Sequence, residues 1–219
     1  MHIEPVSCDS VMLCYEARID ERVLDMVQRD FALLFGREGF IEVVPSYASI
    51  WIRFDTARYT LENVQKHIHT LLQNAPQEAA FKESRLFEIP VDYTQGVDLA
   101  HIAAYAGLSV EEVIARHKAP VYRVYAIGFM VGFAYLGVVD RQIAVPRLET
   151  PRAKVPKGAV AIANEQTAIY PQESAGGWNI VGVTAFDDFE AFRIGDRIRF
   201  VSMNTVGCCA PTAPKRNNA

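Results

Sequence analysis

The segment from Gly128 to Gly137 constrains the fold of this chain more than any other, because it reads G-F-M-V-G-F-A-Y-L-G. Glycines alternate with aromatic residues in a pattern too irregular for a helix and too rich in glycine for an ordinary strand. Glycine permits positive φ angles and close backbone approach, and a neighbouring aromatic ring fills the space that opens. The same pairing recurs in Tyr170-Pro171 and in Ser174-Ala175-Gly176-Gly177-Trp178. We therefore expect bulged, sharply curved β structure with a pocket at its rim.

Composition excludes several classes of protein. The chain has 219 residues, half of them apolar, which is enough for one large domain or two small ones that need no disulfide bonds for stability. Its 22 Lys and Arg against 26 Asp and Glu give a net charge of −4, so nucleic acid is not an expected partner. No stretch approaches the roughly 20 apolar residues of a membrane span. Met1 to Pro5 lacks the features of a secretory signal, and we expect a cytoplasmic protein.

The four cysteines are expected to be free thiols. The spacing of Cys8 and Cys14 fits no common zinc module, and Cys208 and Cys209 are adjacent in a segment rich in Pro and Asn. The sequence therefore predicts neither a disulfide framework nor a metal site.

Residues 1–87 alternate strand and helix signals. Strands are predicted at 3–7, 11–17, 41–45 and 49–54, and helices at 21–35 and 61–73. Asp20 is the expected N-cap of the first helix. The repeated order of two strands and a helix indicates a two-layer α/β domain with its helices on one face of the sheet. The polar segment 74–84 marks the boundary, and a strand at 85–91 leads into the next domain.

Residues 88–204 are predicted to form a β-barrel or sandwich preceded by two short helices. Asp98 and Ser109 are the expected N-caps of these helices, and Glu112 completes a capping box with Ser109. Turn residues then separate strands expected at 122–129, 133–138, 159–163, 167–170, 178–184 and 197–201. The expected class is α+β, with an α/β domain followed by a β-barrel. Residues 205–219 are expected to form a flexible tail.

Two arginines and one histidine are candidate ligand-binding residues. Arg147 and Arg152 each follow a proline, and such a pair can grip a carboxylate or a phosphate. Ordinary surface ion pairs are the alternative for both. His117 ends a helix, where a lone histidine is more often a cap or a core hydrogen-bonding residue than a general base.

Further candidates lie in the predicted turns of the barrel. Gln166, Thr167 and Tyr170 straddle a hairpin and could direct polar groups into a pocket or make structural hydrogen bonds. The backbone of Gly176-Gly177 could approach an anion, with Trp178 as a wall; equally, the two glycines could only shape a turn and Trp178 could belong to the core. The chain has no phosphate loop, dinucleotide fingerprint, zinc-protease motif or nucleophile elbow, so it does not read as a self-sufficient ATPase, dehydrogenase or metalloprotease.

These motifs resemble the family that comprises the B subunit of 5-oxoprolinase, allophanate hydrolase subunit 1 and the KipI-type kinase inhibitors. The family pattern reads G-F-x-P-G-F-x-Y-L-G, then P-R-x-x-x-P-R-x-x-V-P-x-G, T-G-I-Y-P, S-P-G-G-W and G-R-T. This chain matches it in order at 128–137, 146–158, 167–171, 174–178 and 182–184. The resemblance extends from about Val91 to Phe200, and Glu42 to Tyr47 are compatible with the first-half pattern.

The chain departs from the family pattern in four of its motifs. Val131 and Ala175 replace prolines, and Thr94-Gln95 replaces a pair of glycines. Val183 replaces the arginine of G-R-T, which removes one candidate anion ligand. These changes leave the fold assignment intact and bear on catalytic competence.

The resemblance implies a ferredoxin-like N-terminal domain and a cyclophilin-like β-barrel. It implies one component of an ATP-dependent hydrolase that opens 5-oxo-L-proline to L-glutamate together with the C and A subunits, and that is inactive alone. A heteromeric complex is expected, and homodimerisation through an exposed sheet edge is an alternative where the partner is missing. The implied roles are anion or carbonyl recognition for His117, Arg147 and Arg152, pocket walls for Phe129, Tyr170 and Trp178, and backbone donation for Gly176-Gly177. Which residues are catalytic, and which component of the complex binds ATP, stay open.

Two other functions remain open. A KipI-type relative would bind a sensor histidine kinase and block its autophosphorylation, which needs no turnover-competent pocket. A relative from urea or allophanate metabolism would act as part of a biotin-dependent carboxyltransferase, with the biotin carried by another chain because no biotin-attachment sequence occurs here.

Overall fold

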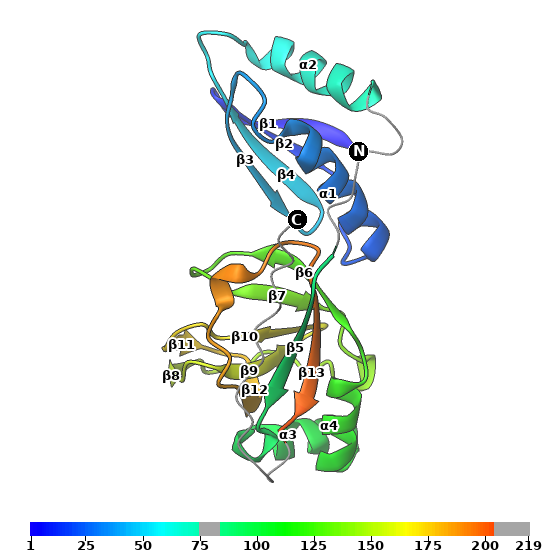
Figure 1. The fold of residues 1–219 in the computed structure, drawn as a ribbon, viewed down its shortest axis with the longest axis vertical. Helices are drawn as coiled ribbons and strands as arrows, with labels where there is room; N and C mark the ends of the chain where they lie inside the picture. Colours follow the sequence, from blue (N-terminus) through cyan, green and yellow to red (C-terminus); the bar gives the residue numbers. More distant parts are fainter. Residues whose placement is uncertain (75–83, 204–219) are drawn as a thin grey trace, which may run out of the picture.

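The computed structural model describes residues 1–74 and 84–203 and contains two larger sheets, each with its own hydrophobic core (Figure 1). The first group of elements is β1 (His2–Ser7), β2 (Ser10–Cys14), α1 (Glu21–Leu34), β3 (Phe40–Ser46), β4 (Ser49–Phe54) and α2 (Leu61–Gln73). All six correspond to predicted elements.

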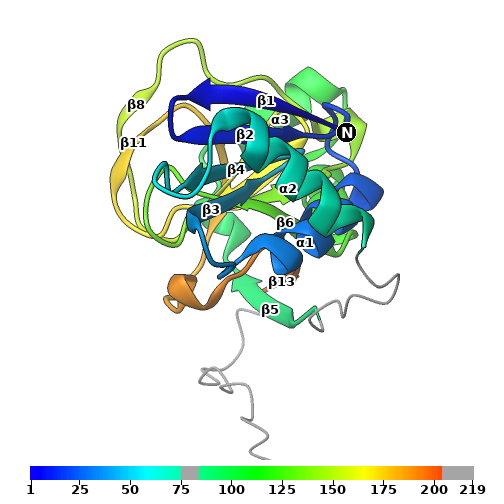
Figure 2. The ribbon, with the colours of Figure 1, turned by 90° about the horizontal axis from the view of Figure 1, so that it is seen from above.

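The first sheet is antiparallel throughout, with the strand order β1-β2-β4-β3. Its strands alternate as predicted, so that Val11, Leu13, Ile50 and Ile52 are fully buried on one face. Helices α1 and α2 pack on that face and contact each other (Figures 1 and 2). The side chain of Asp20 caps α1 as expected, accepting hydrogen bonds from two backbone N–H groups.

The second group of elements begins with β5 (Leu86–Val91), η1 (Tyr93–Gln95), α3 (Leu99–Ala106), α4 (Val110–Lys118), β6 (Tyr122–Ile127), β7 (Ala134–Gly137) and η2 (Arg141–Ile143). It continues with β8 (Arg152–Val155), β9 (Ala159–Ala163), β10 (Gln166–Ile169), β11 (Ser174–Gly176), β12 (Asn179–Val183), η3 (Phe189–Ala191) and β13 (Arg197–Ser202).

Seven of these strands form a nearly closed barrel in the order β12-β9-β10-β7-β6-β13-β5. Its two edges meet at an antiparallel bridge between Asp92, which follows β5, and Val183 at the end of β12. Each backbone N–H of this pair donates to the carbonyl of the other, at 2.8 and 3.1 Å. The predicted α+β class, an α/β unit followed by a barrel, is therefore confirmed.

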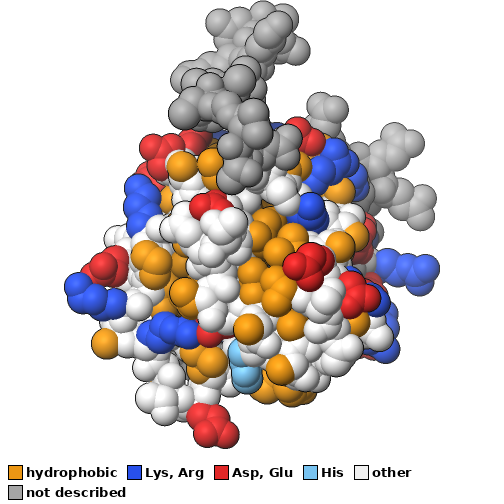
Figure 3. All heavy atoms as spheres, turned by 90° about the horizontal axis from the view of Figure 1, so that it is seen from below, with side chains coloured by type: hydrophobic (Ala, Val, Ile, Leu, Met, Phe, Trp, Pro, Cys, Tyr) orange, Lys and Arg blue, Asp and Glu red, His pale blue; other side chains and the backbone are white. Residues whose placement is uncertain are grey.

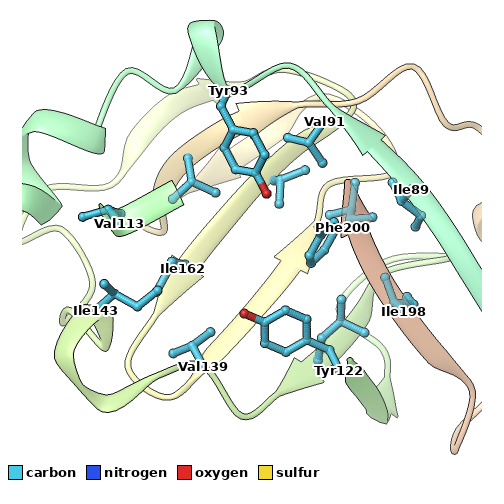
Figure 4. Packing of buried hydrophobic residues seen from close by; sticks show 14 of the residues in the cluster. Ile89, Val91, Tyr93, Val113, Tyr122, Val139, Ile143, Ile162, Ile198 and Phe200 are labelled. Carbon is cyan, nitrogen blue, oxygen red and sulfur yellow. The ribbon is translucent and has the colours of Figure 1, made fainter. Parts of the chain in front are cut away.

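The barrel is filled by apolar side chains from nearly every strand. Figure 4 shows Val91, Ile162, Ile198 and Phe200 meeting in its interior, and all four are at most 1% exposed. Helices α3 and α4 lie at the end of the barrel far from the first sheet (Figure 1). Viewed from that end, hydrophobic side chains gather near the middle of the surface (Figure 3).

The structure differs from the sequence prediction in several strands. The strand expected at 11–17 ends at Cys14. The short strands β8 and β11 pair only with each other, and neither was expected. The strand expected at 122–129 ends at Ile127, because Phe129 takes a positive φ of 72°. No helix among the described residues is long and apolar enough to cross a membrane.

Parts of the chain fall outside this description. Cys8 and Cys14 are free thiols, as expected, whereas Cys208 and Cys209 lie outside the described residues. Most of the predicted boundary segment and all of the predicted tail, residues 205–219, also lie outside them. The domain limits at residues 87 and 204 therefore stay predictions.

Candidate functional site

The loop between β6 and β7 has the tight, irregular shape that its glycines predict. Gly128 N–H donates to the carbonyl of Phe133 at 3.1 Å, and Phe133 N–H donates to that of Met130 at 3.1 Å. Gly132 has a φ of 79°, and a Cβ there would lie 2.7 Å from Phe189 Cβ. The loop forms without the family's proline, and it leaves Val131 74% exposed at its tip.

Four aromatic side chains beneath this loop form one cluster. The Phe133 ring lies at the centre, 4.8 Å from Tyr135, 5.3 Å from Tyr170 and 5.9 Å from Trp178 between ring centroids. All three pairs meet edge to face, the arrangement that aromatic quadrupoles favour. Phe133, Tyr170 and Trp178 are almost fully buried and Tyr135 is partly buried, so this cluster is a rigid base for anything bound above it.

A hollow of about 230 Å³ opens over this cluster. Its lining combines the aromatic base with the β6–β7 loop, the segment before β8, and β11; the residues are Phe129, Phe133, Tyr135, Arg147, Pro151, Tyr170, Ala175, Gly176, Gly177 and Trp178. The structure thus brings together six candidate site residues from the sequence, namely Phe129, Arg147, Tyr170, Gly176, Gly177 and Trp178. Full ligand pockets usually measure roughly 300–1,000 Å³, so this hollow suits a small ligand or part of a larger one.

Arg147 supplies positive charge at the wall of the hollow. Its guanidinium carbon lies 5.7 Å from the centre of the Trp178 ring, within cation–π range. Among residues 1–74 and 84–203, no carboxylate lies within ion-pair distance of Arg147. Burial raises the pKa of the Tyr170 hydroxyl, and the charge of Arg147 partly opposes this shift. A carboxylate or another anion in the hollow would meet an arginine that has no competing acid among the described residues.

The two glycines of the hollow have different structural requirements. A Cβ on Gly176 would lie 2.3 Å from the Tyr170 hydroxyl oxygen, so β11 reaches this ring only with glycine there. Around Gly177 the nearest atoms to such a Cβ are 3.6 Å away, an ordinary contact. Gly177 accepts a hydrogen bond through its carbonyl from Leu148 N–H at 2.8 Å, which fixes the backbone next to Arg147.

Arg152 lies beside the hollow and is engaged elsewhere. Its Nη2 donates to Asp98 Oδ1 at 2.6 Å, and the other oxygen of Asp98 accepts from Ile180 N–H at 2.7 Å. Asp98 is almost completely buried, so this pair joins β8, the start of α3 and β12. Its side chain makes no hydrogen bond to the first turn of α3, so the predicted side-chain cap is wrong: the carboxylate is engaged by Arg152 and Ile180 instead. The structure does not present Arg147 and Arg152 as two free guanidinium groups on one anion.

His117 and Thr167 lie in the barrel core, away from the lining of the hollow. His117 Nε2 is 3.0 Å from Thr167 Oγ1, which itself donates to Ala161 O at 3.0 Å. The hydroxyl proton of Thr167 is thus committed, so His117 Nε2–H is the donor and Nδ1 accepts from the Tyr93 hydroxyl at 2.9 Å. Burial lowers the pKa of His117 to about 3. A neutral, fully enclosed imidazole fits the structural alternative considered for this residue.

Gln166, at the start of β10, connects the barrel to the first sheet. Its Nε2 donates to the hydroxyl of Tyr47 at 3.0 Å, and the Tyr47 ring lies 5.8 Å from that of Tyr135. Tyr47 belongs to the turn between β3 and β4, so the two halves of the chain meet beside the aromatic cluster. Sequence reasoning did not single out Phe133, Tyr135 or Pro151, although all three lie within the motifs that carry the family resemblance.

Comparisons with known proteins agree with those motifs. Residues 1–195 match the family described as carboxyltransferase domain, subdomain C and D. The B subunit of 5-oxoprolinase from Bacillus subtilis (strain 168) is 31% identical over 223 residues, covering 92% of this chain and 92% of that protein. The protein of the same name from Escherichia coli O157:H7 is 41% identical over 140 residues, covering 60% of this chain and 64% of that protein.

Two solved structures share the fold. TTHA0988 has a TM-score of 0.77 at 33% identity over 95% of this chain, which spans 41% of that longer chain. The urea carboxylase of Kluyveromyces lactis has a TM-score of 0.68 over 90% of this chain, which spans 21% of that protein; at 16% identity the likeness concerns the fold alone. The chain therefore belongs to the carboxyltransferase-domain family, subdomains C and D, that includes the B subunit of 5-oxoprolinase.

Proposed function

We propose that this chain is the B subunit of an ATP-dependent 5-oxoprolinase, which opens 5-oxo-L-proline to L-glutamate together with the C and A subunits. The observation that carries the proposal is the 31% identity with the B subunit of Bacillus subtilis 5-oxoprolinase across 92% of both chains. The chemistry of the hollow supports the same substrate class, as the following features indicate.

The hollow suits a small ring that bears a carboxylate. In this proposal the flat face of 5-oxoproline rests on the aromatic base formed with Tyr170 and Trp178, and its carboxylate pairs with Arg147. A charge-assisted hydrogen bond to an arginine without an acidic neighbour is the strongest polar contact that the lining offers. Phe129 would cover the ring from the loop above.

A five-membered lactam is a stable and weakly electrophilic amide, so positioning alone does not open it. ATP would supply the activation of the lactam oxygen, and this chain would hold the ring in a fixed orientation while water attacks the carbonyl carbon. The absence of a phosphate loop from the sequence fits a protein that contributes one wall of a shared site.

Two features support a partner chain at this position. The hollow is small and open, and the loop above it exposes Phe129 by 66% and Val131 by 74%. Apolar side chains presented together beside a ligand site are typical of protein interfaces. The longer TTHA0988 chain, of which this chain spans 41%, continues beyond the shared fold.

Reconstitution tests the proposal directly. This chain, combined with candidate C and A subunits, should form glutamate from 5-oxoproline only when ATP is present. This chain by itself should form none. A complete complex that lacks activity with ATP would overturn the assignment, as would lactam opening by this chain alone.

Replacing Arg147 tests the substrate role of the hollow. Arg147→Ala in the reconstituted complex should raise KM for 5-oxoproline by at least about tenfold, because one charged contact is lost. Arg141→Ala removes an exposed arginine of η2 and provides the matched control, with KM unchanged. Equal KM values for Arg147→Ala and the unaltered complex would remove Arg147 from substrate recognition.

The exposed loop also supports a second candidate function, binding to a sensor histidine kinase. Its apolar tip could contact a helical partner without any turnover in the hollow. A Val131→Asp variant separates the two functions. If the unaltered protein inhibits a sensor histidine kinase and shows no 5-oxoprolinase activity, loss of that inhibition in Val131→Asp would favour the inhibitor. If Val131→Asp instead fails to assemble with the C subunit, the result would favour the enzyme.

A further inference from the structure

Three side chains with metal-binding chemistry meet on β1 and β2, at the edge of the first sheet and outside the lining of the hollow. His2 and Glu4 are two residues apart on β1, so both point to the same face of the sheet. Cys14 on β2 lies directly opposite His2 in the antiparallel register. Side chains at directly opposite positions have their Cβ atoms about 4.5–5.5 Å apart, which places all three within mutual reach.

This face of the sheet is the one that α1 and α2 leave uncovered. Leu13, the residue before Cys14, is fully buried beneath the helices, and Ile3, between His2 and Glu4, packs against the same core. The alternate residues therefore face outward. Figure 2 shows β1 at the outer side of the sheet, where it is an edge strand. A dissolved metal ion would have direct access to the exposed side chains of His2 and Glu4, and Cys14 lies partly buried beside them.

The ligand atoms are close enough for one ion. An imidazole nitrogen of His2, a carboxylate oxygen of Glu4 and Cys14 Sγ all lie within 4.8 Å of one another. His2 Nε2 is 2.8 Å from Glu4 Oε1, and both side chains are more than half exposed. Zinc binds nitrogen and oxygen ligands at about 2.0–2.2 Å and sulfur at about 2.3 Å, so small rotations of the exposed His2 and Glu4 side chains toward Cys14 suffice to enclose it.

We propose that His2, Glu4 and Cys14 form a Zn²⁺ site, with water as the fourth ligand. One imidazole, one carboxylate and one thiolate are all ligand types that zinc accepts, and three protein ligands with one open position are a common zinc arrangement. On binding, the thiol of Cys14 releases its proton to solvent and Glu4 exchanges its contact with His2 for the metal. The site is separate from the proposed 5-oxoprolinase activity.

Cobalt titration tests the site, because Co²⁺ occupies zinc sites and reports thiolate ligation by absorption. The full-length protein, free of any affinity tag and carrying Cys208→Ser and Cys209→Ser, should give a thiolate-to-cobalt charge-transfer band. Visible d–d bands of tetrahedral intensity should appear with it, and added Zn²⁺ should remove both. These two substitutions eliminate the adjacent thiols of the C-terminal segment as a competing ligand pair.

Single variants then identify the ligands. Cys14→Ser should abolish the charge-transfer band, and His2→Ala and Glu4→Gln should each weaken cobalt affinity by at least about tenfold. Cys8→Ser is the matched control, since Cys8 lies in the β1–β2 turn outside the cluster, and it should leave the spectrum unchanged. Far-ultraviolet circular dichroism without metal verifies that each variant is folded.

The opposite results would overturn the proposal. An absent band, a band that survives Cys14→Ser, or a band lost in Cys8→Ser would each show that the three side chains make only surface contacts. Thermal unfolding provides a second measurement. Zn²⁺ should raise the Tm of the protein that carries Cys208→Ser and Cys209→Ser, and it should not raise the Tm when Cys14→Ser is added.

Discussion

Individual residues show how this chain tolerates its departures from the family pattern. Thr94 and Gln95, which stand where the family pattern implies two glycines, adopt no positive φ. Asp92 instead accepts hydrogen bonds from Thr94 N–H, the Thr94 hydroxyl and the Gln95 amide, at 3.0, 2.6 and 2.7 Å. These bonds lower the pKa of the Asp92 carboxyl. At Val183, where the family pattern has an arginine, the bridge to Asp92 that closes the barrel uses backbone atoms alone. Valine at this position therefore leaves the barrel closed.

Protonation of His117 should make the folded protein less stable in acid. The unfolded chain takes up this proton near the ordinary pKa of 6.5, whereas burial lowers the folded pKa to about 3. As pH falls between these values, the unfolded state binds more protons and the free energy of unfolding decreases by up to about 1.4 kcal/mol per pH unit. Urea denaturation at a series of pH values measures this slope.

Two histidine variants test whether His117 causes this dependence of the free energy of unfolding on pH. His117→Asn should reduce the pH dependence below the ordinary histidine pKa, in addition to any general loss of stability. His69→Gln, which changes an exposed histidine of α2, should retain it. Identical slopes in all three proteins would assign the acid sensitivity to other groups.

At the scale of elements, the pairing of β8 with β11 is one feature that sequence patterns did not predict. Each strand is short, and neither joins the main barrel sheet. Their pairing has a register shift between Ser174 and Gly176. Such pairing depends on the long connection between them and on contacts with Tyr170, and neither appears as local periodicity.

Glycine at position 176 should be required for β11 to pack on Tyr170. Gly176→Ala places a methyl group against the tyrosine hydroxyl and should reduce the free energy of unfolding by about 1–3 kcal/mol. Gly177→Ala is the matched control, because an added Cβ there would make only ordinary van der Waals contacts. It should change the free energy of unfolding by no more than about 0.5 kcal/mol. Chemical denaturation of both variants measures the difference; equal losses would contradict the packing argument.

At the scale of the whole molecule, polar contacts hold α1 against the barrel. Arg123 of β6 is 9% exposed and donates to Asp25 at 2.7 Å and to Gln28 at 2.9 Å. Gln28 in turn donates to the carbonyl of Ile194 at 2.8 Å. With the Tyr47–Gln166 contact, these bonds fix the first sheet beside the hollow. The position of the two halves therefore depends on a few long-range hydrogen bonds.

Removing Arg123 should uncouple the two halves. Arg123→Ala should cost about 2 kcal/mol because it leaves the partners on α1 without their donor. Arg199→Ala removes an exposed arginine paired with Glu88 and should cost less than about 1 kcal/mol. Trp51 lies in β4 and Trp178 in the barrel, so Trp51→Phe and Trp178→Phe backgrounds report each half by fluorescence.

Coincident transitions are expected for the unaltered protein in both backgrounds. Separate transitions should appear after Arg123→Ala, with the first sheet unfolding at lower denaturant concentration. Coincidence in the Arg123→Ala protein would show that other contacts couple the halves.

Local patterns alone determined most of the elements of this protein. Apolar alternation and the capping residues Asp20 and Ser109 specify strands and helices because these signals act between near neighbours in the chain. The resemblance that the Gly-aromatic motifs carry implied Phe129, Tyr170 and Trp178 as pocket walls, and all three line the hollow.

Only the tertiary structure decided which polar groups face solvent and which are enclosed. Arg147 and Arg152 look alike in sequence, but Asp98, distant in the chain, engages one of them. His117 is enclosed by strands on several sides, and His2 meets Cys14 only through the register of β1 and β2. Burial and long-range pairing depend on how distant segments pack, and for that reason no local pattern could predict them.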